Sequence, residues 1–109
     1  MKKNYNKLVR DRIPEIIEAG GNTCTVQVLS DKDYLTMLDA KLTEELAEYH
    51  ADGNPEELAD LLEVIYAAAQ ARGVSVEALE EIRAAKAQKR GAFQKKLLLV
   101  DVDENTDAP

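Results

Sequence analysis

Cysteine is almost absent from this sequence, and long apolar runs are missing altogether. Cys24 has no second cysteine to pair with, so an internal disulfide and a cysteine-based zinc site are both excluded. No stretch is long and apolar enough to predict a membrane span, and the charged opening MKKNYNKLVRDRIPE lacks the apolar core of a signal peptide. We therefore expect a cytoplasmic protein.

Basic residues are also in deficit, with 14 Lys and Arg against 21 Asp and Glu and a formal net charge of -7. This balance argues against nonspecific binding to nucleic acid or to an anionic membrane. It leaves room for an anionic small molecule, because a bound metal ion reverses the local sign of charge. The expected partners are therefore small molecules rather than nucleic acid or membrane.

The 109 residues are enough for one domain with a modest core. We expect a single helical domain over residues 1–102 and an acidic, disordered tail over residues 103–109, which has no apolar side chain larger than Ala. Long helices in so short a chain leave apolar surface uncovered, so self-association is expected as well.

The periodicity of apolar residues predicts a mainly α-helical bundle with a small β element. Leu35, Leu38, Leu42 and Leu46 recur at helical spacing, and the stretch from Leu58 to Ala69 is apolar over most of its circumference. Two β-branched or apolar stretches, TCTVQVL and KKLLLVDV, indicate short strands. The predicted helices span residues 14–19, 31–49, 55–71 and 76–89, and the predicted strands span 23–29 and 96–102.

A short turn between the two long helices carries the main functional signal. Gly53 suits a helix end, Asn54 an N-cap and Pro55 the first position of a new helix. A connection this short makes the helices antiparallel neighbours. Two acidic motifs, Glu44-Glu45-x-x-Glu48 and Glu57-x-x-Asp60, flank it, and residues three apart share a helix face. Converging carboxylates repel one another unless a cation joins them, and oxygen ligands favour Mg²⁺ or Mn²⁺.

Simpler interpretations compete with a metal site. Acidic pairs at this spacing are usually solvated helix faces, and Glu44 falls opposite the apolar stripe, where water is expected. Glu57 stands three residues after Asn54 and could simply close a capping box. That interpretation does not account for Asp60, Glu45 or Glu48 at the margin of an apolar face, where an unpaired carboxylate costs free energy.

Two basic clusters are candidates for binding an anion. Lys86 and Arg90 share one face near a helix end, where interaction with the helix dipole is the simpler explanation. Beside a metal–carboxylate site, they would neutralise phosphate oxygens that the metal does not reach. Arg10 and Arg12 in the stretch KLVRDRIP are either surface charge or a further anion contact.

The order of these motifs resembles the MazG-like superfamily of all-α nucleoside-triphosphate pyrophosphohydrolases. The resemblance rests on EExxE, then ExxD within LADLLEV, then Lys-x-x-x-Arg-Gly-x-Phe, over residues 6–100. The opening KLVRDRIPEII and the stretch KLTEELAE resemble the phosphoribosyl-ATP pyrophosphohydrolase-like branch. The gap between Glu48 and Glu57 is shorter than in better-known members, so residues that select the substrate there would be missing or relocated.

This resemblance implies Mg²⁺-dependent hydrolysis of a nucleoside triphosphate to the monophosphate and pyrophosphate, in the service of clearing unwanted nucleotides. Mn²⁺ is a possible substitute. It further implies a homodimer or tetramer. The alternatives are phosphoribosyl-ATP hydrolysis and a non-catalytic, metal-binding helical interaction protein. The implied metal ligands are Glu45, Glu48, Glu57 and Asp60; the implied groups acting on water are Glu44 and Glu45; and the implied phosphate contacts are Lys86, Arg90, Arg10 and Arg12.

Overall fold

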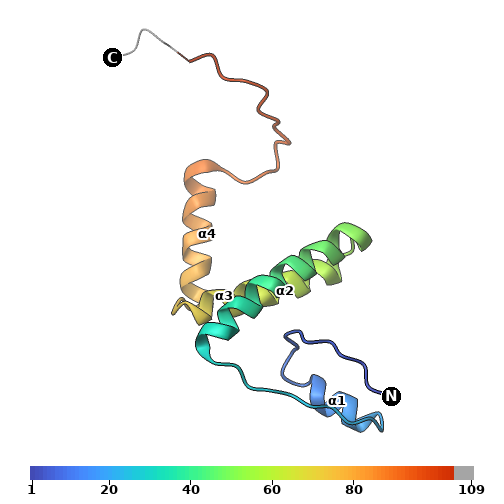
Figure 1. Ribbon diagram of the computed structural model, residues 1–109. Helices are drawn as coiled ribbons and strands as arrows, with labels where there is room; N and C mark the ends of the chain where they lie inside the picture. Colours follow the sequence, from blue (N-terminus) through green and yellow to red (C-terminus); the bar gives the residue numbers. More distant parts are fainter. Residues whose placement is uncertain (105–109) are drawn as a thin grey trace. The chain divides into compact units, whose positions relative to one another are not determined.

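The computed structural model describes residues 1–104, and the prediction of a mainly helical chain is confirmed over that range. The chain divides into two compact units, Met1–Val76 and a second that begins at Glu77, and each is described by itself. The helices of the described residues are α1 (Ile13–Ala19), α2 (Asp31–Asp52), α3 (Pro55–Ala71) and α4 (Val76–Arg90) (Figure 1).

Helix α2 is bounded by a side-chain cap at its start and a backbone cap at its end, and the sequence predicts the second of these at Gly53. The Ser30 hydroxyl accepts a hydrogen bond from the backbone N–H of Asp33 at 3.2 Å and starts the helix. The helix continues three residues beyond the predicted end at Tyr49, because Gly53 is the residue that adopts the left-handed conformation, with φ 66°. The Gly53 N–H donates to the Tyr49 carbonyl oxygen at 2.7 Å, which closes the last turn.

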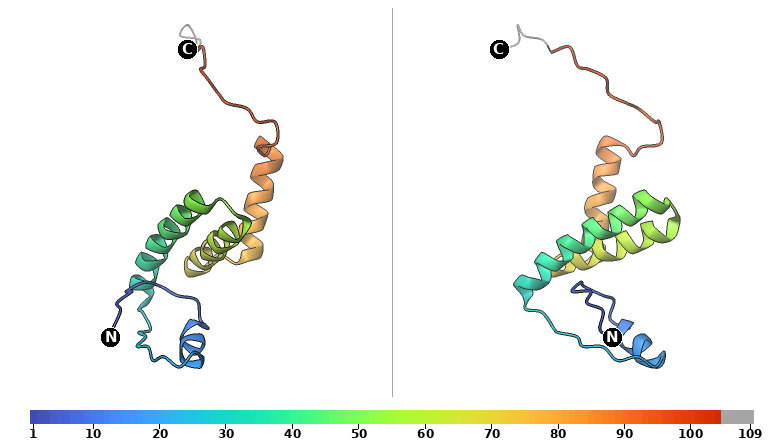
Figure 2. Two further views of the ribbon diagram at one scale, coloured as in Figure 1. Left: turned by 90° about the vertical axis from the view of Figure 1, so that its right-hand side faces the viewer. Right: turned by 45° about the vertical axis from the view of Figure 1, so that its right-hand side comes forward.

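Helix α3 starts immediately after this turn, as predicted. The Asn54 side-chain oxygen accepts from the Glu57 N–H at 3.0 Å, and Pro55 occupies the first turn of the helix. Helices α2 and α3 therefore form a hairpin whose two arms lie side by side in both views of Figure 2. The hairpin is the main packing contact of the first unit.

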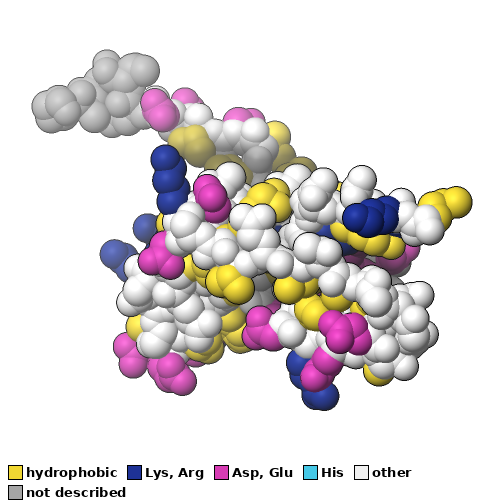
Figure 3. All heavy atoms as spheres, turned by 60° about the horizontal axis from the view of Figure 1, so that its bottom comes forward, with side chains coloured by type: hydrophobic (Ala, Val, Ile, Leu, Met, Phe, Trp, Pro, Cys, Tyr) yellow, Lys and Arg dark blue, Asp and Glu magenta, His cyan; other side chains and the backbone are white. Residues whose placement is uncertain are grey.

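The interior of the described chain is small. Leu38 on α2 is the one hydrophobic side chain among residues 1–104 that is fully buried, with 2% of its surface exposed. Large apolar side chains of the hairpin stay partly open to solvent, among them Leu46, Leu58, Leu62 and Ile65. On the face shown in Figure 3, hydrophobic side chains reach the surface between acidic ones. This hairpin thus leaves much of its apolar surface uncovered.

The predicted β element is not present in residues 1–104: both stretches are extended chain without strand pairing. Val28 is 96% exposed, and Leu97, Leu98 and Val100 are similarly open. A strand is stable only when a neighbouring backbone satisfies its N–H and C=O groups, and two isolated strands are marginal even when paired. β-branched composition alone therefore overpredicted strands at 23–29 and 96–102.

The remaining elements follow the predictions closely. Helix α1 begins at Ile13, one residue before the predicted start, and α4 ends at Arg90, one residue after the predicted end. Gly91, with φ 84°, follows α4 directly. Of the predicted acidic tail, Asp103 and Glu104 are exposed and non-helical, and residues 105–109 lie outside the described residues. Within the described part of the chain, no helix has both the length and the apolar character needed to cross a membrane.

Candidate metal site

The acidic motifs meet near the closed end of the α2–α3 hairpin. Each of Glu45, Glu57 and Asp60 offers a carboxylate oxygen, and these three oxygens all lie within 4.8 Å of one another. Glu45 comes from α2, and Glu57 and Asp60 come from successive turns of α3, so the turn at Gly53–Asn54 creates the cluster. We call these residues the carboxylate trio. Three of the four predicted metal ligands are thus brought together.

Glu48, the fourth predicted ligand, is not a member of the trio. Glu48 is exposed and lies one helical turn beyond Glu45 on α2. Its charge still acts on the site, because it contributes to the raised pKa of Glu45 and interacts with Glu57. Glu48 therefore borders the trio rather than completing it.

The interior oxygens of the trio lack hydrogen-bond partners. Only 6% of the Glu45 surface is exposed, and the Oε2 atoms of both Glu45 and Glu57 are buried without a partner. Burial, followed by the neighbouring charge of Glu48, raises the pKa of Glu45 above its ordinary value. Burial, followed by the charges of Asp52 and Asp60, raises the pKa of Glu57. An orphaned buried carboxylate oxygen is costly, so these two atoms call for a proton or a cation.

Glu44 has a different environment from its neighbour Glu45. It was predicted to face water, but the Lys7 ammonium donates to its Oε1 at 2.9 Å and the Lys41 ammonium to its Oε2 at 3.3 Å. The hydrogen bond from Lys7, against a smaller opposing effect of burial, lowers the pKa of Glu44. Glu44 is therefore a paired carboxylate, held ionised beside the trio.

Lys41 is a site residue that sequence reasoning missed. Its side chain is only 15% exposed, and its Nζ lies 3.4 Å from Oε1 of Glu45 as well as near Glu44. The signal was available, because Lys41 precedes Glu44 by three residues and Glu45 by four on the same helix. Lys7 was missed as a partner of α2 because 37 residues separate it from Glu44.

Arg10 contacts the trio directly. Its Nη2 lies 2.7 Å from Oδ1 of Asp60, although the two residues are 50 apart in sequence. The prediction for Arg10 and Arg12 was a phosphate contact, and the structure separates the pair: Arg12 forms an ion pair with Glu15 in α1. Of the two arginines, Arg10 is therefore the one at the acidic site.

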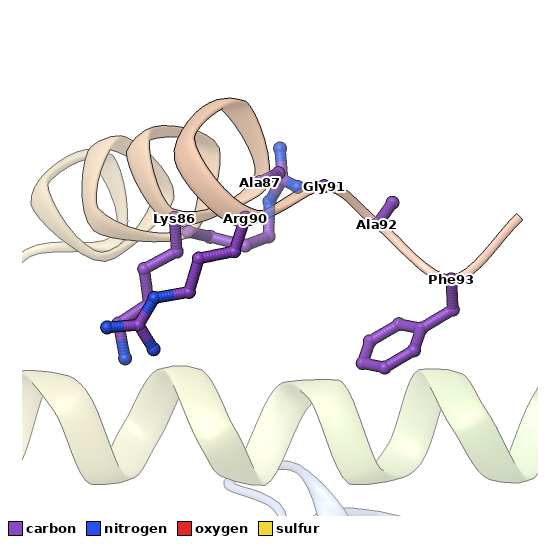
Figure 4. A pocket seen from close by; sticks show the side chains of 7 residues that line it. Lys86, Ala87, Arg90, Gly91, Ala92 and Phe93 are labelled. Atoms are coloured by element: carbon purple, nitrogen blue, oxygen red, sulfur yellow. The ribbon is translucent and has the colours of Figure 1, made fainter. Parts of the chain in front are cut away.

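Lys86 and Arg90 belong to the second unit. The hollow that they line is open, has a volume of about 440 Å³ and lies at the end of α4; its other lining residues are Arg83, Ala87, Gly91, Ala92 and Phe93. Figure 4 shows the Lys86 and Arg90 side chains on the same side of the helix, with the Phe93 ring beyond its end. Phe93 is 96% exposed. The predicted basic pair thus forms one face beside an aromatic ring, a combination suited to an anion that carries a flat group.

The donor set of the trio fits a hard divalent cation. Its members are all carboxylates, which Mg²⁺ and Mn²⁺ prefer over nitrogen or sulfur ligands. The two unpartnered buried oxygens are the observation that favours binding over mere solvation. Glu45, Glu57 and Asp60 are the residues that would hold the ion.

Comparison with known proteins leaves the family of the chain open. No family model matches the sequence, and no solved structure matches it. A stretch of 45 residues, 41% of this chain, is 58% identical to an uncharacterized protein of Mycolicibacterium smegmatis and covers 46% of that protein. The chain thus spans about half the length of the curated relative it matches.

Proposed function

We propose that this protein is a Mg²⁺-dependent nucleotide pyrophosphohydrolase that cleaves a nucleoside triphosphate into the monophosphate and pyrophosphate. The observation that carries the proposal is the pair of buried, unpartnered oxygens on Glu45 and Glu57 beside Asp60. Such atoms are destabilising in a metal-free fold, and sites that keep them usually do so for function. The resemblance of the motifs to the MazG-like superfamily supports the same reaction.

Each side chain at the acidic site has a distinct role in this proposal. Glu45, Glu57 and Asp60 hold the ion, and Glu48 adds negative charge from outside the trio. A bound Mg²⁺ would lower the pKa of a water molecule and offset charge on the phosphates. Glu44, kept ionised by Lys7 and Lys41, is suited to accept a hydrogen bond from the attacking water.

The basic residues supply the remaining charge compensation. Lys86 and Arg90 are proposed to contact phosphate oxygens and not the base, since charge is what they share. Arg10 is proposed as the phosphate contact of the first unit, and Arg12, which pairs with Glu15, is proposed to contribute less to phosphate binding. Removing Lys86 or Arg90 should then weaken binding similarly for triphosphates with different bases.

The proposed assembly is a homodimer, with a tetramer as the larger form. Leu58, Leu62 and Ile65 on α3 and Leu46 on α2 are between 38% and 47% exposed in the single chain. Burying apolar surface contributes about 25 cal/mol per Å², so covering such a face favours association. Light scattering at micromolar concentration would detect it, and a fully active monomer of 12.1 kDa would contradict it.

Turnover assays test the proposed reaction directly. The purified protein, with Mg²⁺ and a panel of ribo- and deoxyribonucleoside triphosphates, should release pyrophosphate and the monophosphate. Asp60→Asn should lower turnover by orders of magnitude while the helical content is retained. Glu63→Gln is the matched control, because Glu63 is an exposed carboxylate one turn further along α3 and should leave turnover unchanged. An Asp60→Asn protein with ordinary activity would remove the site assignment.

The same assay separates the alternatives. Hydrolysis of phosphoribosyl-ATP in preference to all nucleoside triphosphates would assign the substrate of the related branch. Metal binding without turnover of any of these compounds would favour a non-catalytic interaction protein. The Arg10–Asp60 ion pair is the observation compatible with that second outcome, since it compensates an acidic residue without any substrate.

A further inference from the structure

The segment from Lys7 to Arg10 bridges both helices of the hairpin through its basic side chains. Lys7 pairs with Glu44 on α2 at 2.9 Å, and Arg10 pairs with Asp60 on α3 at 2.7 Å. We call residues 7–10 the basic arm. One contact is with Glu44, the sequence neighbour of Glu45, and the other is with Asp60 of the carboxylate trio, so together they tie the amino-terminal segment to the hairpin at this site.

The contact of Arg10 overlaps with the trio. Asp60 is at once the partner of Arg10 and one of the three residues whose oxygens converge. A guanidinium on Asp60 offsets the same negative charge that a divalent cation would, and two positive groups at one carboxylate repel each other. Within the trio, Arg10 pairs with Asp60. The buried Oε2 atoms of Glu45 and Glu57 remain without a hydrogen-bond partner.

The Arg10–Asp60 pair is also open to solvent, which makes it exchangeable. The side chains of Arg10 and Asp60 are 56% and 41% exposed. Exposed ion pairs contribute about 0–1 kcal/mol, because water screens them and both side chains lose freedom. A divalent ion held by several carboxylates can therefore displace this pair, whereas it could not displace a buried one.

We propose that the basic arm is a displaceable counter-cation, in which Arg10 competes with the divalent metal for Asp60 and leaves when the metal binds. This inference rests on the proposed metal site. The arm compensates the acidic cluster before metal arrives, and it sets a lower apparent affinity for the ion. The released guanidinium is then free to contact the phosphates of the substrate.

Mn²⁺ binding to the full-length protein without nucleotide tests the competition. Free Mn²⁺ is measured by electron paramagnetic resonance for the wild type, Arg10→Ala and Arg12→Ala. Loss of Arg10 should tighten Mn²⁺ binding about two- to fivefold, the range expected when an exposed ion pair no longer competes. Arg12→Ala removes the same charge from the same segment but only breaks the pair with Glu15, so its affinity should match the wild type.

Hydrogen exchange of the wild-type protein gives a second readout that needs no substitution. Addition of Mn²⁺ should speed exchange of the Ile13 amide, which donates to the Arg10 carbonyl oxygen at 3.1 Å, as the arm separates from α3. Slower exchange of this amide, or equal affinities for Arg10→Ala and Arg12→Ala, would overturn the competition while leaving the metal site standing. Weaker Mn²⁺ binding by Arg10→Ala would make Arg10 a positioning residue and would also overturn it. Absence of Mn²⁺ binding in all three proteins would overturn the proposed metal site as well.

Discussion

Replacing Glu45 by glutamine should stabilise the metal-free protein, although Glu45 is among its most buried residues. The substitution keeps the shape of the side chain and removes its charge. In the wild type that charge lies within 4.8 Å of oxygens from Glu57 and Asp60, and one of its own oxygens has no partner. The substitution also removes one favourable interaction, the ion pair with Lys41 at 3.4 Å.

The magnitude follows from these distances. With an effective dielectric constant of about 20, each repulsion at that separation is worth roughly 3.5 kcal/mol, and the attraction to Lys41 is worth roughly 5 kcal/mol. The two repulsions therefore exceed the attraction by roughly 2 kcal/mol. Solvent screening of the half-exposed Asp60 reduces this difference, while relief of carboxylate burial adds to it. We expect a net gain of about 1–2 kcal/mol in the free energy of unfolding.

Glu44→Gln is the matched control, with the same chemical change one residue away. Glu44 accepts hydrogen bonds from Lys7 and Lys41, so losing its charge should lower the free energy of unfolding. Urea unfolding followed by circular dichroism, without divalent ions, should therefore move the two midpoints in opposite directions. Excess Mn²⁺ should reverse the order of wild type and Glu45→Gln, because a ligand that binds only the folded state stabilises it by mass action.

A destabilised Glu45→Gln protein in metal-free buffer would refute this reasoning. It would mean that the ion pair with Lys41 outweighs both repulsions and the burial of the charge. Equal shifts for Glu44→Gln and Glu45→Gln would be as damaging, since the two neighbouring carboxylates have opposite environments.

Two further predictions concern pH and the turn. Mn²⁺ affinity should fall as the pH drops towards the raised pKa values of Glu45 and Glu57, above the ordinary 4.5, because a protonated carboxyl does not bind metal. The free energy of unfolding of the metal-free protein should rise as the pH falls over the same range, because the folded state takes up these protons more readily than the unfolded chain. Glu45→Gln should weaken this dependence of stability on pH. Gly53→Ala should lower the free energy of unfolding by about 1–2 kcal/mol, because φ is 66° and a left-handed backbone is unfavourable for alanine. Nothing lies within 4 Å of a new Cβ, so the backbone conformation alone should account for the loss. Gly53→Asn should cost less, as asparagine tolerates this conformation, and equal midpoints for the Gly53→Ala and wild-type proteins in thermal unfolding would contradict the assignment.

Local signals in the sequence were sufficient for the four helices and for most of their ends. Ser30, Asn54 and Pro55 act within one turn of their own position, so their effect can be predicted without knowing the fold. The end of α2 was placed three residues early because Tyr49 closes the apolar stripe, whereas the backbone remains helical until the glycine. Helix ends thus depended on backbone conformation more than on hydrophobic pattern.

The site was predictable to the extent that helix geometry determines it. Spacing along α2 and α3, joined by a tight turn, sufficed to bring Glu45, Glu57 and Asp60 together. The same spacing predicted Glu48 as a fourth ligand, but Glu48 is exposed and is not part of the trio. The contacts of Lys7 and Arg10 were beyond reach, because they depend on how a non-helical segment returns to the hairpin across 37 and 50 residues. Strand predictions failed for the related reason that pairing partners are not encoded locally.

Charge balance connects the acidic cluster to its proposed ligand. The two acidic motifs hold five carboxylates, and three basic side chains pair with them, so the cluster carries a formal excess of two negative charges. The residues counted are Glu44, Glu45, Glu48, Glu57 and Asp60 against Lys7, Arg10 and Lys41. When Arg10 leaves Asp60, as proposed, the excess becomes three negative charges, and one divalent cation offsets two of them. Burial and neighbouring charge raise the pKa of both Glu45 and Glu57, so without the ion these carboxylates take up protons more readily than ordinary glutamates do. Protons, the basic arm and a metal ion would then compete for the same carboxylates, and the metal should prevail where protons are scarce.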